Sequence, residues 1–255
     1  MRSFLPGVSA GVRWRGLRRV VPGLGAAVLG TLVEYTGRMM ALGAPGGVDL
    51  PYVSWWPDPS VVWISVLWLG WAINGLLFLS SRHRSVAAPV LSAVLFAVLL
   101  TDRALYSNHL YLLAMLAPLA AWAEAGERRV RLLPVTLMKL LVSIVYLFAA
   151  LAKIHPVYLS GSVLSDYASA VLPALPLPSV LAWGSVALEL FLAFGLWHRR
   201  SRRLAFVTGV VLHLTLLVHT AELLGVGVFG LTMVSCYPLF RCEAARPGSS
   251  GTPEA

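Results

Sequence analysis

Residues 134–153 read PVTLMKLLVSIVYLFAALAK, an almost continuous run of apolar side chains. The hydrocarbon core of a bilayer is about 30 Å thick, and a helix needs about 20 apolar residues to cross it. This stretch has that length, so we expect a membrane-spanning helix here. It also contains both lysines of the chain, Lys139 and Lys153. An ionisable group at membrane depth is costly, which makes each lysine a candidate for a function or for a buried partner.

The rest of the chain has the same apolar character. Of its 255 residues, 58% are hydrophobic and only 12% are charged, against about 45–50% apolar and 25% charged residues in soluble domains. This composition excludes a soluble enzyme. We expect an all-α integral membrane protein, a bundle of about eight transmembrane helices, with the other seven spans at 20–41, 61–80, 86–105, 108–123, 179–197, 204–223 and 226–240.

The basic residues predict the orientation of these spans. Sixteen of the 20 lie before the first span or in every second connection after it, and cytoplasmic loops are the ones enriched in Lys and Arg. Both termini are therefore expected to be cytoplasmic. Residues 1–19 would form a basic cytoplasmic N-terminus, residues 20–242 the transmembrane domain, and residues 243–255, rich in Pro, Gly and Ser, a disordered cytoplasmic tail.

Several classes of partner are not expected. The net charge is +9, but the basic residues are dispersed between apolar runs and form no continuous stripe for a nucleic acid backbone. The two cysteines, Cys236 and Cys242, cannot form a disulfide framework or a thiolate zinc site. No metal-ligand spacing of His and acidic residues is present, so we expect no metal site.

Polar residues of different spans are expected at the same depth. The predicted topology puts Asp102, Asn108, His109, Lys153, His155 and His219 near the extracytoplasmic ends of their spans, and Tyr146 lies two helical turns before Lys153. These groups predict a polar pocket suited to proton abstraction, because a desolvated lysine can act as a base.

A structural interpretation stands beside each of these assignments. Lys153 could be a cation at a helix C-terminus, and Lys139 could extend its ammonium group to the interface. Glu189 and His213, both in mid-span, could form buried interhelical hydrogen bonds. Within the first span, Glu34 and Arg38 have the i, i+4 spacing of an ion pair.

Four stretches of the sequence form a recognisable set. Residues 144–153 read IVYLFAALAK and are followed by LSG at 159–161, residues 106–112 read YSNHLYL, and LEL and YPLF stand at 188–190 and 237–240. Together they resemble the HTTM domain proteins, a family that includes the transmembrane part of the vitamin K-dependent gamma-carboxylase, and the lysine-bearing stretch is the most specific of them. The resemblance covers roughly residues 55 to 242, within an HTTM-like domain of 20–242.

The resemblance implies a chemistry and a set of roles. In the carboxylase, the matching lysine is taken as the base that deprotonates vitamin K hydroquinone, oxygen converts the quinol to an epoxide, and carbon dioxide adds to a protein Glu. Carried over, Lys153 and His109 would be catalytic. Substrate would be bound by Asn108, Tyr111, Tyr146, Glu189 and either His213 or His219. Reduced vitamin K or menaquinol would be the cofactor, with oxygen and carbon dioxide as co-substrates.

The resemblance also implies a location, and it leaves alternatives open. We expect a multi-pass protein of the bacterial inner membrane, in contact with lipid and an isoprenoid quinol, with its site facing the extracytoplasmic side. The carboxylase has a large extracytoplasmic portion that handles its protein substrate, so quinol epoxidation is predicted more directly than carboxylation. The alternatives are a non-catalytic quinone or lipid binder or transport protein on the same scaffold, and a partner module of a redox or secretion complex.

Overall fold

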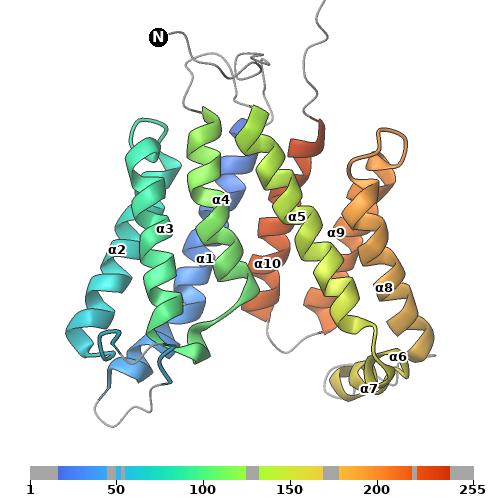
Figure 1. The fold of residues 1–255 in the computed structure, drawn as a ribbon, viewed down its shortest axis with the longest axis horizontal. Coiled ribbons are helices and arrows are strands. Elements are labelled where there is room, and N and C mark those ends of the chain that lie inside the picture. Colours follow the sequence, from blue (N-terminus) through green and yellow to red (C-terminus); the bar gives the residue numbers. More distant parts are fainter. Residues whose placement is uncertain are drawn as a thin grey trace, which may run out of the picture.

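The computed structural model describes residues 17–44, 50–52, 55–124, 132–168, 178–219 and 223–241. The expected tail at 243–255 and most of the basic N-terminus lie outside these residues. All regular structure in the described part is helical, which confirms the all-α class (Figure 1). The elements are α1 (Leu17–Gly43), α2 (Val61–Leu79), α3 (Arg84–Thr101), η1 (Arg103–Leu105), α4 (Asn108–Glu124), α5 (Leu132–Lys153), α6 (Pro156–Leu159), α7 (Ser162–Ala168), α8 (Pro178–Gly195), α9 (Arg202–His219), α10 (Leu223–Cys236) and η2 (Tyr237–Arg241).

Six segments of the described structure are long and apolar enough to cross a membrane. They lie in α1, α2, α3, α5, α8 and in α10 together with η2. Two helices expected as spans, α4 and α9, are not among these six. α4 has only 17 residues, and α9 begins with Arg202 and Arg203. The structure therefore supports a multi-pass integral membrane protein with six such segments, and the count of eight stays a prediction.

The helices pack side by side around α1. α1 contacts α2, α4 and α10, while α5 packs against α4 and α8, and α9 lies between α8 and α10. In Figure 1, α2 and α3 form one side of the bundle, α8 and α9 form the other, and α1, α4, α5 and α10 lie between them. The lysine-bearing helix α5 thus joins the central helices to α8.

Every second connection lies at the same end of the bundle. The start of α1, the α2–α3 turn, the α8–α9 turn and η2 all lie at the upper end in Figure 1. The starts of α2, α4 and α8, with α6 and α7, lie at the lower end. The described arginines of the turns, such as Arg82 and Arg199, are therefore at the upper end. Which side of the membrane this end faces stays a prediction.

Helix α3 ends four residues before the predicted third span does, because Asp102 terminates it. α3 ends at Thr101, and Asp102 adopts an extended conformation that separates it from η1. Its carboxylate accepts hydrogen bonds from the backbone N–H groups of Ala104 and Leu50, both at 2.6 Å. Asp102 therefore ties the α1–α2 connection to the end of α3, and no hydrogen bond or ion pair among the described residues joins it to Lys153.

A buried arginine closes the upper end of α2. Arg84 donates hydrogen bonds to the carbonyl oxygens of Phe78 and Leu79 at the end of α2, and it forms an ion pair with Glu124 at the end of α4. Those carbonyl groups have no partners within their own helix, because the last turn of a helix leaves its acceptors unsatisfied. One side chain thus holds the ends of three helices together.

Glycine lets α1 and α10 approach closely. A Cβ atom added at Gly23 would lie 2.7 Å from the Cβ of Ser235 and 2.0 Å from its Oγ. The Ser235 Cβ cannot rotate away, so the two backbones would have to separate. A Cβ atom added at Gly37, farther along the same helix, would meet nothing within 4 Å.

These two glycines give a matched test of the packing. We expect Gly23→Ala to lower the free energy of unfolding by about 1 to 3 kcal/mol, the usual cost of overpacking. Gly37→Ala should leave it unchanged or raise it by up to about 1 kcal/mol, since alanine is the better helix former. Unfolding in mixed micelles, followed by circular dichroism, measures both. Equal effects of the two substitutions would contradict the described α1–α10 contact.

Candidate functional site

The lysine at the end of α5 pairs with a carboxylate of α8. Lys153 Nζ forms an ion pair with Glu189 Oε1, and we call these two residues the α5–α8 ion pair. The Glu189 side chain is only 6% exposed and that of Lys153 is 24% exposed. Lys153 is the last residue of α5, and Glu189 lies well inside α8. The sequence predicted both residues for the site, and the structure brings them into direct contact.

The short helix α6 covers this ion pair. The Tyr158 ring centroid lies 5.6 Å from Lys153 Nζ, within the range of a cation–π contact. The Tyr158 hydroxyl is hydrogen-bonded to Ser185 Oγ of α8 at 2.9 Å. His155 caps α6, because its ring accepts the backbone N–H of Tyr158 at 3.3 Å. The residues directly after Lys153 therefore fold back over its amine.

A glycine makes that reversal possible. Gly161 has a φ of +85°, which side chains other than glycine rarely adopt. A Cβ atom there would lie 2.5 Å from the backbone of Pro178 and of Ser179 at the start of α8. The glycine of the LSG motif after α5 thus has a structural role, because it lets the α6–α7 turn pack closely against the start of α8.

One oxygen of the ion pair has no partner. Glu189 Oε2 is buried and accepts no hydrogen bond in the described structure, although its companion Oε1 pairs with Lys153. Buried polar atoms are nearly always satisfied, because an unmade hydrogen bond at a buried acceptor costs about 1–3 kcal/mol. The arrangement therefore leaves an acceptor available for a donor group beside the lysine amine.

A second cluster lies on the same helix, two turns from Lys153. The Tyr146 hydroxyl is hydrogen-bonded to His213 Nε2 of α9 at 2.8 Å and to the Tyr237 hydroxyl of η2 at 2.5 Å. We call these three residues the tyrosine–histidine cluster. His213 Nδ1 is also buried without a hydrogen-bond partner in the described structure. Tyr237 was missed as a site residue, although its YPLF motif was noticed.

The other histidine that the sequence offered for this position is His219. His219 is the last residue of α9, and its side chain lies outside the described residues. His213 is the one that the structure places against Tyr146.

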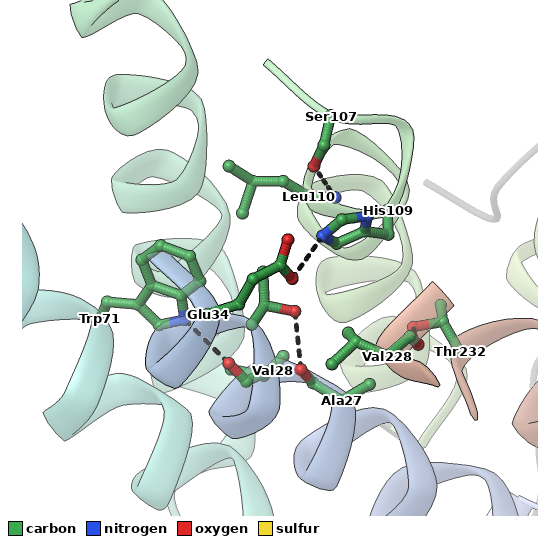
Figure 2. Close-up of polar contacts among 10 residues, drawn as sticks. Ala27, Val28, Glu34, Trp71, Ser107, His109, Leu110, Val228 and Thr232 are labelled. Atoms are coloured by element: carbon green, nitrogen blue, oxygen red, sulfur yellow. Dashed lines mark hydrogen bonds and ion pairs between the residues drawn. The ribbon is translucent and has the colours of Figure 1, made fainter. Parts of the chain in front are cut away.

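His109 belongs to a third cluster, between α4 and α1. His109 Nε2 of α4 lies 2.9 Å from Glu34 Oε2 of α1, and their side chains are 11% and 9% exposed. Figure 2 shows the imidazole and the carboxylate pointing toward each other between the two helices. We call these residues the α1–α4 ion pair.

This contact corrects the expected pairing of Glu34. No ion pair joins Glu34 to Arg38 within the described residues; the Arg38 guanidinium lies over the Tyr35 ring, 5.4 Å from its centroid. The partner of Glu34 is 75 positions away in the sequence, so spacing along one helix could not find it. The signal that was present is an acidic residue inside an apolar span.

Two expected binding residues have exposed side chains. Asn108 accepts a hydrogen bond from the Tyr106 hydroxyl at 3.4 Å, and Tyr111 packs edge-on against Phe96 with its ring 43% exposed. The described contacts do not link either residue to the α5–α8 ion pair. Their role in binding stays a prediction.

The structure therefore sorts the candidates into separate groups. No hydrogen bond or ion pair in the described residues joins Lys153 to His109, and the lower ends of α4 and α5 diverge in Figure 1. No group of three or more His, Cys, Asp or Glu side chains that could hold a metal ion occurs among the described residues. What the α5–α8 ion pair offers chemically is an amine and a buried carboxylate that can exchange a proton with a bound donor.

The tyrosine–histidine cluster gives a stability test. Tyr146→Phe removes one hydroxyl and two hydrogen bonds, so we expect the free energy of unfolding to fall by about 0.6 to 2 kcal/mol. Tyr111→Phe is the matched control, because that ring is exposed; its effect should stay within about 0.5 kcal/mol. The same micelle unfolding experiment measures both. A Tyr146→Phe protein as stable as the control would show that the cluster adds nothing to folding.

Comparison with known proteins places the chain in a family. The family described as HTTM domain matches residues 24–244. No curated protein and no solved structure matches the chain. The match covers most of the chain, including all three clusters, and the resemblance to the transmembrane part of the vitamin K-dependent gamma-carboxylase follows from it. From its helical membrane fold and this match over residues 24–244, we conclude that the chain belongs to the HTTM domain family.

Proposed function

We propose that this protein is a membrane enzyme related to the vitamin K-dependent gamma-carboxylase, which binds an isoprenoid hydroquinone and uses Lys153 as the base for its oxygen-dependent epoxidation. The observation that carries the proposal is the unpartnered Glu189 Oε2 beside the Lys153 amine. The proposal includes coupling of epoxidation to a carboxylation step, with reduced vitamin K or menaquinol as cofactor and oxygen and carbon dioxide as co-substrates.

The residues present fit such a group. A hydroquinone carries two phenolic hydroxyls, and one of them would satisfy Glu189 Oε2 as a donor. Exposed apolar side chains of α5 and α8, among them Leu151 and Trp183, offer a surface for an isoprenoid chain within the bilayer. When bound, the quinol would supply a weakly acidic hydroxyl and the reducing equivalents that react with oxygen.

The α5–α8 ion pair can take a proton in two steps. Glu189 Oε2 accepts the hydrogen bond and orients the donor, while Oε1 holds the Lys153 amine in place. Lysine can release its proton when it is desolvated, whereas arginine cannot. In the first step, one Nζ proton would move to Glu189 Oε1 and leave a neutral amine. In the second, that amine would take the proton of the hydroquinone hydroxyl, with Glu189 as its positioning partner.

The other clusters have secondary roles in the proposal. His109 would hold or polarise the oxygenated substrate, and Glu34 would fix the orientation of its imidazole, as carboxylates do for functional histidines. Asn108, Tyr111, Tyr146 and one of His213 and His219 would line the substrate region. The arginine-bearing turns lie at the opposite end of the bundle, so the proposal puts both termini in the cytoplasm of a bacterium and the site on the extracytoplasmic side of its inner membrane.

A second function is favoured by the contacts of Lys153 itself. Its ammonium group is already compensated by Glu189 and by the Tyr158 ring, as a purely structural cation would be. The protein would then be a non-catalytic quinone- or lipid-binding or transport protein on the same scaffold.

The two lysines of α5 allow a sharp test. Full-length protein in nanodiscs is supplied with menaquinol and oxygen, and epoxide is followed by mass spectrometry. Lys153→Arg keeps the positive charge but removes a group that can lose its proton, so we expect turnover to fall by roughly 10²- to 10⁴-fold. Lys139→Arg, made on the same helix at the other end, should retain activity within about twofold because it lies outside the site.

Each result assigns one function. Epoxide that requires Lys153 but not Lys139 supports the enzyme. Full activity of Lys153→Arg would exclude lysine as the base. Absence of epoxide with the unsubstituted protein, together with saturable menaquinone binding that survives Lys153→Arg, would establish the binding protein instead.

A further inference from the structure

Five arginines line one cavity at the upper end of the bundle. The cavity has a volume of about 530 Å³ and is lined by residues of the α8–α9 turn, the start of α9 and η2. We call it the arginine pocket; its lining residues are Arg199, Arg200, Arg202, Arg203, Phe206 and Arg241. Among the described residues, no acidic side chain lines it, and its volume is in the range of small-ligand sites, about 300–1,000 Å³.

The positive charges of this pocket are not neutralised within the described structure. The ion pairs of the described residues involve Arg84, His109 and Lys153, none of which lines the pocket. The pocket residues without a carboxylate partner among the described residues are therefore Arg199, Arg200, Arg203 and Arg241. Like charges gathered in one concave site raise its positive potential and attract an anion. The pocket therefore has the electrostatic character of an anion site.

Two contacts hold the pocket in shape. Arg241 lies over the Phe206 ring, 4.9 Å from its centroid, which fixes the direction of its guanidinium group. Arg202 donates to the carbonyl oxygens of Leu196 and Trp197, at 3.3 and 3.4 Å, and so ties the start of α9 to the residues that follow α8. The walls thus come from two parts of the chain, the α8–α9 turn with the first turns of α9, and η2, which lie about 40 positions apart in the sequence.

The neighbouring Trp197 favours a position of the pocket near lipid headgroups. Trp197, next to it in the turn, is 39% exposed and donates its indole N–H to Ser143 at 2.6 Å. Tryptophan with an exposed ring and a bonded N–H is typical of the membrane–water interface. Guanidinium groups bind phosphate oxygens through two parallel hydrogen bonds, and basic pockets between membrane helices bind anionic headgroups.

We propose that the arginine pocket binds a phosphate group, carried either by an anionic phospholipid or by a soluble phosphate compound. This site is at the opposite end of the bundle from the α5–α8 ion pair, and it is independent of the proposed quinol chemistry. Arg200 and Arg203 are exposed side chains of the pocket wall; neither makes a hydrogen bond or ion pair in the described structure, so both are available to the ligand.

Native mass spectrometry of the full-length protein in detergent tests the proposal. Phosphatidylglycerol and phosphatidylcholine are titrated separately, and inorganic phosphate is added as a competitor in a parallel series. We expect phosphatidylglycerol to bind more tightly than phosphatidylcholine, and the double variant Arg200→Gln/Arg203→Gln to lose affinity for it by roughly tenfold. Arg82→Gln is the matched control, because Arg82 is an exposed arginine of the α2–α3 turn at the same end.

The lipid titrations and the competition with inorganic phosphate distinguish the two sources of the phosphate group. Phosphatidylglycerol binding that millimolar inorganic phosphate does not displace identifies the lipid headgroup as the ligand. Displacement at micromolar inorganic phosphate identifies a soluble phosphate compound. Equal binding of the two lipids with no effect of inorganic phosphate would overturn the proposal, as would equal affinities of the double variant and Arg82→Gln. If the double variant does not fold, Arg200→Lys/Arg203→Lys takes its place, with a smaller loss expected.

Discussion

Compensation of buried charge is the constraint on which this structure depends. In an apolar bundle an ionisable side chain is tolerated when a partner on another helix, or a bound group, compensates it. Three such partnerships occur in the described part of the chain, and each joins different helices: Arg84 of α3 with Glu124 of α4, His109 of α4 with Glu34 of α1, and Lys153 of α5 with Glu189 of α8. The contacts that stabilise the bundle are thus the same ones that place its reactive groups.

The three partnerships differ in what they leave unsatisfied. Arg84 uses its remaining donors on the carbonyl oxygens that end α2, so its role is complete without a ligand. The α5–α8 ion pair is different, because Glu189 Oε2 is buried without a donor. The residues after Lys153 add to this difference. The Tyr158 ring covers the Lys153 amine, and the turn at Gly161 holds this segment against α8. This combination is why we assign the base to the end of α5 and not to the α1–α4 ion pair.

The sequence predicted the helices better than their partners. The starts of α2 and α4 and the end of α5 fall at the expected residues, because runs of apolar side chains bounded by polar ones are a local signal. The expected third span was too long, since the two hydrogen bonds that make Asp102 a helix stop include one to Leu50, 52 positions away. The pairing of Glu34 with Arg38 was wrong for the same reason. Glu189 and Lys153 were both expected in the site from the family motifs, but only the packing of α5 on α8 shows that they touch.

The most direct test of the account is to locate the bound quinone. A photoreactive menaquinone analogue is irradiated with the full-length protein in nanodiscs, and labelled peptides are identified by mass spectrometry, with excess menaquinone as competitor. The account predicts competed labels on the peptides of α5, α6 and α8 that surround Lys153 and Glu189. Competed labels confined to α1 and α4, around Glu34 and His109, would contradict it and would transfer the site to the other ion pair.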